Sequence, residues 1–289
     1  MPKALLIKQI SNRYTLLDEN HKRLIAVAAG KMKLKESPMV GDWIEYQIKD
    51  DQVVMQSFEK RRTVLRRPVI ANVDQALIVM SARKPDFSTQ LVDRFVWLIK
   101  NAGISPVLIV TKMDLILEDD PIHYALKQYE KEGLSVIRVY RGQEIIGLED
   151  VIAHKISVLT GQSGVGKSTL LNRLNPEFVL HTQEISKALG RGKHTTRHVE
   201  LYEVAQGWVA DTPGFSSLEF NAIPLDQLSY LVSAFDPYRD HCHFRNCLHI
   251  NEPKCAIKQA VQDQKIDADR YQHYTEVVQL IQNTKEIYL

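Results

Sequence analysis

A glycine-rich segment near the middle of the chain leaves few folds open. Residues 161–168 read GQSGVGKS, which fits the pattern G-x-x-x-x-G-K-[ST] of a phosphate-binding loop. An apolar stretch typical of a buried strand, Ile156–Thr160, precedes it, and a helical stretch, Thr169–Leu174, follows it. Glycines let backbone N–H groups converge on phosphate oxygens, and the helix adds the positive end of its dipole. The sequence therefore predicts a strand–loop–helix unit that binds a nucleoside triphosphate.

Chemistry at a triphosphate requires a cation and a magnesium site, and the chain offers both. We expect Lys167 to neutralise charge on the β- and γ-phosphates and the Ser168 hydroxyl to ligate Mg²⁺. The sequence DTPG follows a short predicted strand, Val209–Ala210. Its Asp211 can hold Mg²⁺ through a water molecule, and the N–H of Gly214 can sense the γ-phosphate. Together the two segments predict a magnesium-dependent triphosphate site.

The residues around the loop alternate between strand and helix patterns. An amphipathic run from Leu91 to Ala102, ended by Gly103, lies between the first two predicted strands. Such alternation predicts a mostly parallel, doubly wound sheet, and we assign residues 68–218 to this α/β domain. The predicted parallel strands are Ala76–Ser81, Val107–Thr111, Val136–Tyr140 and Ile156–Thr160, and the predicted hairpin comprises His198–Val204 and Trp208–Asp211.

A tetrapeptide at the end of one predicted strand indicates which base is bound. Thr111-Lys112-Met113-Asp114 (TKMD) includes and follows the end of that strand. Open α/β sheets bind ligands at the carboxyl ends of their strands. The Asp114 carboxylate can accept the hydrogens on both N1 and N2 of guanine, which adenine does not offer, and the stem of Lys112 can lie over the base. TKMD therefore predicts guanine recognition.

Residues 1–67 have the pattern of a small all-β domain. Turn residues separate five short runs, Leu5–Lys8, Tyr14–Leu17, Leu24–Val27, Trp43–Ile48 and Val53–Met55. Five strands of this length fit a small closed barrel. An OB-fold, a common nucleic-acid binder, and an SH3-like barrel give the same pattern. The segment ends in a basic cluster that is either a set of phosphate contacts or a solvated linker, formed by Lys60, Arg61, Arg62, Arg66 and Arg67.

Residues 219–289 carry helical patterns and all three cysteines. The predicted helices are Pro224–Phe235 and Asp267–Ile281. Between them, the spacing C-x4-C-x-H-x5-C gathers four metal-ligand side chains, Cys242, Cys247, His249 and Cys255. Three thiolates and an imidazole make a closed tetrahedral site for one structural Zn²⁺, which would supply folding free energy to this segment. His241 and His243 are alternative ligands.

Composition excludes several classes of protein and predicts no partner. The 289 residues are 44% hydrophobic and 25% charged, which excludes collagenous, disordered and disulfide-scaffold proteins. A net charge of +2 favours no class of partner. No stretch is apolar enough to span a bilayer or to form a signal-peptide core. We therefore expect a cytoplasmic protein that makes no membrane contact. The sequence carries no signal for the oligomeric state, and we take the chain to be a monomer.

The motifs occur in an unusual order. Ras-like and translational GTPases place the phosphate loop first and the N/TKxD motif last. Here TKMD at 111–114 precedes GQSGVGKS at 161–168, and DTPG at 211–214 comes last. This order, with a β-barrel before it and a Cys/His cluster after it, closely resembles the circularly permuted GTPases of the ribosome small-subunit-dependent GTPase A family, also called RsgA or YjeQ.

The resemblance covers essentially the whole chain. Arg67-Pro68 with Ala71–Gln75 looks like the family's linker signature, and Gly192–Thr196 looks like its first switch loop. The resemblance implies a GTPase that converts GTP to GDP and phosphate, binds ribosomal RNA and acts in late maturation of the small (30S) ribosomal subunit. It further implies stimulation by that subunit, release of assembly factors, and the cofactors Mg²⁺ and Zn²⁺.

The resemblance also implies roles for individual residues. Phe215 stands where Ras-like enzymes carry the glutamine that orients the attacking water. His194 is our candidate for that role, and Thr195 or Thr196 for a ligand of Mg²⁺. The histidine that some family members carry after DxPG has no counterpart in residues 215–220. The residues expected to bind GTP are Thr111, Lys112, Met113, Asp114, Gly161, Gln162, Ser163, Gly164, Val165, Gly166, Lys167, Ser168, Thr169, Asp211 and Gly214.

One segment departs from the family pattern, and two alternative functions stay open. The segment expected near the far side of the base, Val139-Tyr140-Arg141, lacks the usual Ser-Ala pair. An ATPase or kinase-like enzyme unrelated to ribosomes would share the phosphate loop, although TKMD disfavours it. A non-enzymatic RNA-binding module with a nucleotide-stabilised fold is favoured only by Phe215.

Overall fold

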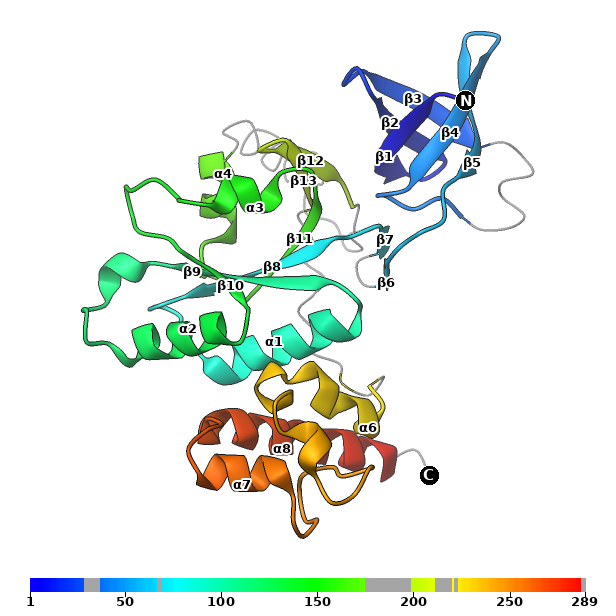
Figure 1. Cartoon of the computed structure of the whole chain (residues 1–289). Coiled ribbons are helices and arrows are strands. Elements are labelled where there is room, and N and C mark those ends of the chain that lie inside the picture. The colour runs from blue at the N-terminus through cyan, green and yellow to red at the C-terminus, as the bar shows by residue number, and fades with distance from the viewer. Residues whose placement is uncertain (29–36, 67–68, 175–198, 211–219, 221–222, 287–289) are drawn as a thin grey trace. The chain divides into compact units, whose positions relative to one another are not determined.

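The computed structural model describes residues 1–28, 37–66, 69–174, 199–210, 220 and 223–286 (Figure 1). These residues form two compact units. One unit comprises the described residues within 1–79 and 142–216, and the other comprises those within 80–141 and 217–289. Among the residues described, no helix is both long and apolar enough to cross a membrane.

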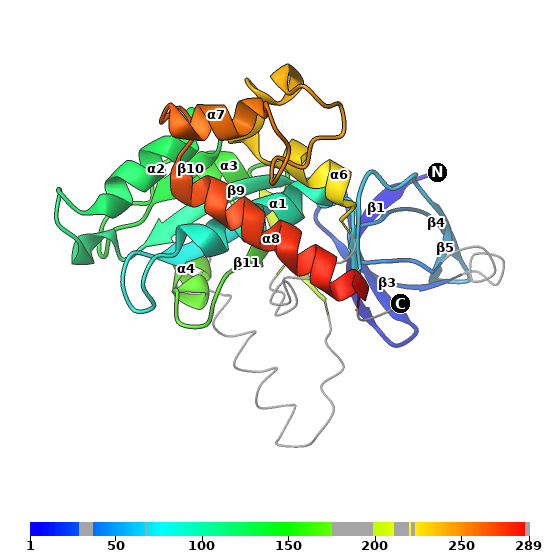
Figure 2. The same ribbon diagram turned by 90° about the horizontal axis from the view of Figure 1, so that it is seen from below.

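The first five strands form a closed barrel (Figure 2). They run in the order β1-β2-β3-β5-β4, with β3 parallel to β5 and the other pairs antiparallel. Alternate side chains point inward, as the alternating runs predict, so that Ala4, Leu6, Tyr14, Leu16 and Ile44 fill the interior. The crossover that makes β3 and β5 parallel is the OB-fold arrangement, which decides against the SH3-like alternative. The strands are β1 (Lys3–Ile10), β2 (Arg13–Asp18), β3 (Arg23–Ala28), β4 (Trp43–Lys49) and β5 (Gln52–Phe58).

Two cations of the basic cluster after the barrel, Arg61 and Arg62, have different partners. Arg61 is largely buried and pairs with the fully buried Asp42, through Nε to Oδ1 at 2.8 Å and Nη2 to Oδ2 at 2.8 Å. Arg62 instead pairs with Asp74 at 2.8 Å. Arg61 is therefore neither a phosphate contact nor part of a solvated linker, but a structural cation of the barrel. Beyond it, β6 (Val64–Arg66) and β7 (Val69–Ala71) form a small antiparallel sheet.

The central sheet has six strands in the order β10-β9-β8-β11-β13-β12. Strand β11 is parallel to β8 and β13, β9 is parallel to β10, and the hairpin strand β12 runs antiparallel to β13. Every residue of β8 and β11 is buried, which explains why these strands read as apolar runs rather than alternating ones. The strands are β8 (Gln75–Ser81), β9 (Ser105–Thr111), β10 (Ser135–Arg138), β11 (Ile156–Thr160), β12 (Leu201–Val204) and β13 (Gly207–Ala210).

The described residues of the α/β part of the chain form four α-helices. Helix α1 (Thr89–Asn101) packs against β9, α2 (Pro121–Lys131) against β10, and α3 (Leu148–Ile152) against β13; α4 (Lys167–Leu174) follows the glycine-rich loop. Helix α2 was not among the predicted elements. Its start has a clear signal, because the Asp120 carboxylate accepts the N–H of Ile122 at 3.0 Å and Pro121 occupies the first helical position.

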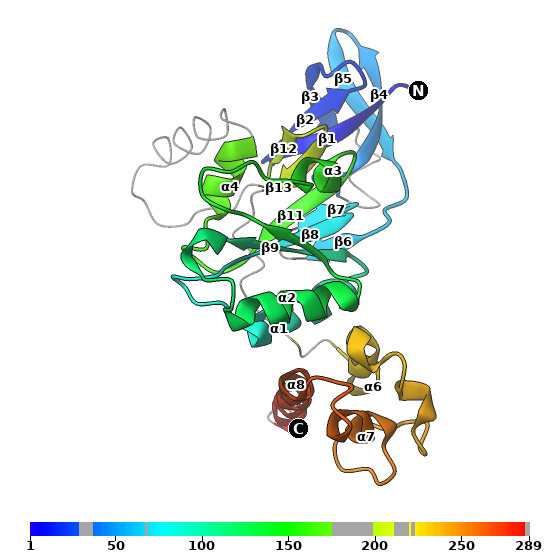
Figure 3. The ribbon, with the colours of Figure 1, turned by 60° about the vertical axis from the view of Figure 1, so that its left-hand side comes forward.

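The C-terminal part is helical, but one predicted helix is wrong (Figure 3). In place of a continuous helix over Pro224–Phe235 there is a short α6 (Leu225–Leu228) followed by two 3₁₀ turns. The backbone is extended at Val232, with φ −93° and ψ 96°, and this break lets both Val232 and Phe235 bury their side chains completely. Helices α7 (Ala256–Gln262) and α8 (Ala268–Glu286) complete this part.

A buried ionic cluster attaches α8 to α1 and α2. Asp93 of α1 is 1% exposed and accepts hydrogen bonds from the Tyr129 hydroxyl and His273 Nδ1 at 2.8 and 2.7 Å. It also forms an ion pair with Arg270, whose Nε lies 2.9 Å from Asp93 Oδ2. Arg270 also pairs with Glu132, and its guanidinium lies 4.4 Å from the ring centroid of Tyr129. Burial and the charge of Asp93 raise the pKa of Tyr129, so this hydroxyl stays protonated as a donor.

Candidate functional site

The glycine-rich loop joins β11 to α4, as the sequence predicts. Gly161, Gly164 and Gly166 all have positive φ, at 137°, 81° and 99°. At Gly161 the reason for glycine is also steric, because a Cβ would lie 2.1 Å from the carbonyl oxygen of Val79 in β8. The loop therefore lies directly against the neighbouring strand, and only glycine fits there.

Some side chains of the loop and of α4 are buried, and others are exposed. Val165 in the loop and Leu170 and Leu171 in α4 are buried. Lys167, the first residue of α4, folds back so that its ammonium donates to the carbonyls of Gly161 and Gln162 at 2.8 and 2.7 Å. The exposed residues of the loop and first helical turn are Gln162, Ser163, Gly164, Ser168 and Thr169. The loop thus presents its backbone, its lysine and its hydroxyls at the start of a helix, which is the chemistry that phosphate binding needs.

TKMD lies at the carboxyl end of β9. The Thr111 hydroxyl donates to the Met80 carbonyl at 3.2 Å, and the Thr111 carbonyl accepts the Ala82 N–H at 2.9 Å. Lys112 has φ 58°, and its ammonium donates to the carbonyl of Lys84. The left-handed backbone conformation of Lys112 ends the strand and turns the chain. Asp114 lies in the 3₁₀ turn that follows, Met113–Leu115.

Asp114 is exposed and held in one orientation. Its Oδ1 accepts the backbone N–H of Arg141 at 2.9 Å. Met113, whose side chain is buried, also holds the turn in place, because its backbone N–H donates to the Val139 carbonyl at 3.2 Å. The segment Val139-Tyr140-Arg141, which we expected near the base, therefore supports the TKMD turn through its backbone groups. Contact of this segment with the base stays a prediction.

Several expected site residues lie outside the residues that the structure describes. These are Asp211, Gly214, His194, Thr195 and Thr196, together with Phe215.

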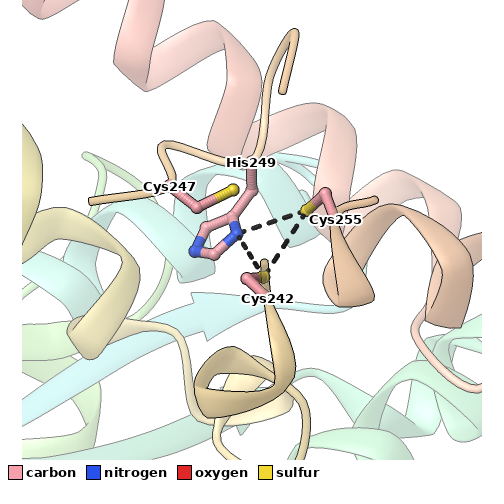
Figure 4. Close-up of side chains that lie close together, drawn as sticks. All are labelled: Cys242, Cys247, His249 and Cys255. Carbon is pink, nitrogen blue, oxygen red and sulfur yellow. Dashed lines mark hydrogen bonds between the residues drawn. The ribbon is translucent and has the colours of Figure 1, made fainter. Parts of the chain in front are cut away.

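Cys242, Cys247, His249 and Cys255 form one cluster, as predicted (Figure 4). Their ligand atoms all lie within 4.8 Å of one another. The Sγ atoms of Cys242 and Cys255 are 3.8 Å apart, and Nδ1 of His249 lies 3.5 and 3.4 Å from them. A tetrahedral ion with metal–sulfur bonds of about 2.3 Å needs sulfur–sulfur edges of about 3.8 Å. The cluster thus has the size and donor set of a tetrahedral metal site. His241 and His243 are exposed and take no part in it, so these alternatives are wrong.

The electrostatics of the cluster favour neutral ligands until a cation binds. Burial raises the pKa of the Cys247 thiol to about 12 and also raises the pKa of Cys255. Burial lowers the pKa of His249 to about 4, so its imidazole is neutral and able to ligate. Thiols with raised pKa values become thiolates only when a positive ion compensates the charge. The arrangement therefore suits a divalent cation.

A carboxylate and two tyrosines hold the loop that carries His249. Glu252 accepts the N–H groups of Leu248 and Ile250 at 2.8 and 2.9 Å, one on each side of the histidine. From α8, Tyr271 donates to the His249 carbonyl at 2.7 Å and Tyr274 to the Leu248 carbonyl at 2.9 Å. These supports were not predicted from the sequence. The one available signal was an acidic residue three positions after the histidine.

Comparisons with known proteins agree with the motifs. A family model described as RsgA GTPase matches residues 57–221. The small ribosomal subunit biogenesis GTPases RsgA 2 of Oceanobacillus iheyensis and RsgA of Bacillus subtilis are each 44% identical to the chain, and each alignment covers 100% of both sequences. The crystal structure of YloQ, a circularly permuted GTPase, matches with a TM-score of 0.86 at 38% identity, over 98% of this chain and 96% of that one. YjeQ from Thermotoga maritima matches with a TM-score of 0.83 at 30% identity, over 97% and 98%.

Proposed function

The chain belongs to the RsgA GTPase family and is a GTP hydrolase, and on this premise we propose that it acts in biogenesis of the small ribosomal subunit. We propose further that the subunit stimulates hydrolysis, that the reaction belongs to late maturation, and that hydrolysis accompanies release of assembly factors. The proposal is supported by relatives that carry the name small ribosomal subunit biogenesis GTPase and align over their full length. It implies work in the cytoplasm, as a monomer.

GTP binding is proposed to use both strand-end segments. The backbone N–H groups of residues 161–166 and the Lys167 ammonium would surround the β- and γ-phosphates, with Ser168 and Thr169 at the first turn of α4. The Asp114 carboxylate would accept the N1 and N2 hydrogens of guanine, in the orientation that the Arg141 N–H gives it. Support comes from the order of motifs, which is the order of a circularly permuted GTPase.

Magnesium would be held by the Ser168 hydroxyl, and we propose Asp211 and either Thr195 or Thr196 as its further partners. The ion would withdraw charge from the phosphate oxygens. Gly214 is proposed to contact the γ-phosphate. Because Phe215 cannot orient a water molecule, we propose His194 for that role, and slow intrinsic hydrolysis follows from the missing glutamine.

The metal of the Cys/His cluster is proposed to be one structural Zn²⁺. Four protein ligands leave no open position for a substrate or a reacting water, and three sulfurs with one imidazole are a donor set typical of zinc. We further propose a division into an OB-fold at 1–67, a permuted GTPase domain at 68–218 and a zinc-binding helical domain at 219–289, with ribosomal RNA as the partner of the first and last.

The experiment that tests this function is GTP turnover with and without purified small ribosomal subunits. We expect slow turnover alone and a marked increase with subunits, both lost in Lys167→Ala and Ser168→Ala. Equal use of ATP would favour the ATPase alternative. Turnover absent under all conditions would favour the non-enzymatic RNA-binding module.

A further inference from the structure

Strand β1 of the barrel contacts the last strand of the central sheet. That strand, β12, ends the sheet order and pairs with β13. Lys8 of β1 and Glu200, the residue directly before β12, form an isolated antiparallel β-bridge. The Lys8 ammonium also lies 2.6 Å from Glu200 Oε2. The barrel and β12 belong to the same compact unit, so both the bridge and the ion pair lie within one unit.

A β-bulge in β1 turns the Lys8 side chain out of the barrel. In the pairing with β2, Leu6 lies opposite Leu16, and both point into the barrel interior. Lys8 then lies opposite Thr15, so β1 has one extra residue at this point. Residues opposite each other in antiparallel strands share a face, and Thr15 lies between two inward-facing residues of β2. Lys8 therefore points outward, whereas in a strand without the bulge it would point into the apolar interior.

The ion pair is partly shielded from water. The side chains of Lys8 and Glu200 are 29% and 12% exposed. A second pair joins the barrel to β12, between His21 Nδ1 and Glu203 at 3.3 Å, but its side chains are 67% and 47% exposed. Salt and water screen partly buried charges much less than exposed ones. The Lys8–Glu200 pair is therefore the contact that can hold the start of β12 against the barrel.

In the sequence, Glu200 closely follows the segment proposed to bind magnesium. Thr196 precedes it by four positions. Four residues of chain span at most about 14 Å, so the position of Glu200 limits where Thr195 and Thr196 can lie. Mg²⁺ demands near-ideal octahedral geometry with ligands at about 2.1 Å. A small displacement of a threonine ligand is therefore enough to weaken binding of the ion.

We propose that Lys8 is a positioning residue for Mg²⁺ in GTP hydrolysis. It holds Glu200, and through the chain before β12 it limits the position of the threonine that ligates the ion. The inference rests on the proposed function, which supplies Thr195 or Thr196 as that ligand. It gives the barrel a second role, because one of its strands then supports the GTPase site as well as the barrel itself.

The test is reversal of charge on each side of the pair and on both sides together, in the full-length protein. Lys8→Glu and Glu200→Lys each bring two like charges together, and the double variant restores an opposite pair. The quantity measured is the Mg²⁺ concentration for half-maximal binding of a fluorescent, non-hydrolysable GTP analogue. We expect each single variant to raise this concentration about fivefold, and the double variant to return it to the value of the unaltered protein.

Lys3→Glu is the matched control. It makes the same change in the same strand, but it breaks an exposed pair within the barrel, with Glu59, and should leave the Mg²⁺ requirement unchanged. Lys8→Met and Glu200→Gln remove the pair without bringing like charges together, and they should raise the requirement in the same direction. Hydrogen exchange of the amides of residues 201–204 should be faster in the single reversals and restored in the double variant. The thermal midpoint of each variant confirms that it is folded.

Three results would overturn the proposal. These are a Mg²⁺ requirement that neither single reversal changes, an increase that the double variant does not correct, and an equal increase in Lys3→Glu. Thr195→Ala and Thr196→Ala separate this proposal from the proposed function. An increase in one threonine variant with none at Lys8 or Glu200 contradicts only the positioning role. No increase in either threonine variant contradicts the proposed magnesium ligands, and the positioning role with them.

Discussion

Replacement of Asp93 by asparagine is expected to loosen the attachment of α8. Asp93 is 1% exposed, accepts hydrogen bonds from Tyr129 and His273, and forms an ion pair with Arg270. Removal of one partner from a buried ion pair costs about 3–5 kcal/mol, because the other charge stays buried. Asparagine keeps one oxygen acceptor, and Arg270 keeps Glu132, so we expect the lower end of that range, about 3 kcal/mol.

Hydrogen exchange of the α8 amides is the suitable assay, because it reports opening of this helix without assuming that the whole chain unfolds in one step. A loss of about 3 kcal/mol corresponds to exchange about 150-fold faster. Asp119→Asn, at an exposed aspartate in the loop before α2, is the control and should leave exchange unchanged. If α8 stays equally protected in Asp93→Asn, the reasoning that this cluster holds the helix is refuted.

Three further changes test other parts of the structure. Cys247→Ser should abolish binding of one equivalent of zinc, measured by metal analysis, and should lower the protection of the amides of residues 236–260 from hydrogen exchange. Zinc retained at one equivalent would contradict the ligand assignment. Burial tends to raise the pKa of Glu252, but its backbone N–H partners outweigh this and hold it below the ordinary value of 4.5. The stability that Glu252 contributes should therefore be present above pH 4.5 and decline as the pH falls through the lowered pKa, a decline that Glu252→Ala removes from acid titrations of stability. Gly161→Ala should lower the free energy of unfolding by about 2 kcal/mol or more and impair GTP binding, because its Cβ would meet the Val79 carbonyl. Gly142→Ala is the control: no atom lies within 4 Å of its Cβ, and thermal unfolding should show a loss of about 1 kcal/mol.

Those parts of the molecule that depend on local sequence were predictable. The glycine-rich loop, its flanking strand and helix, and the hairpin near Gly207 depend on residues adjacent in sequence, and they are confirmed. The four candidate metal ligands also lie close together in sequence, and their spacing sufficed to identify the cluster. The contacts of TKMD with a guanine base stay a prediction.

Features that join distant segments could not be read from the sequence. Asp93 and His273 are 180 positions apart, and neither stands out in its own helix pattern. Arg61 looked like one of five similar cations until the fold placed it beside Asp42. The helix predicted over Pro224–Phe235 failed for a related reason, because burial of Phe235 next to the metal ligands depends on tertiary packing rather than on local propensity.

The most direct test of guanine recognition by TKMD is the nucleotide preference of Asp114→Asn. Asparagine keeps an oxygen for the Arg141 N–H, so the turn should remain intact, but its amide would donate where the carboxylate accepts. We expect GTP affinity to fall about 150-fold or more, because two charge-assisted hydrogen bonds are worth about 3 kcal/mol at the least. We expect affinity for xanthosine triphosphate to rise, because xanthine presents a carbonyl in place of the amino group. Unchanged GTP binding with no gain for xanthosine triphosphate would contradict the account.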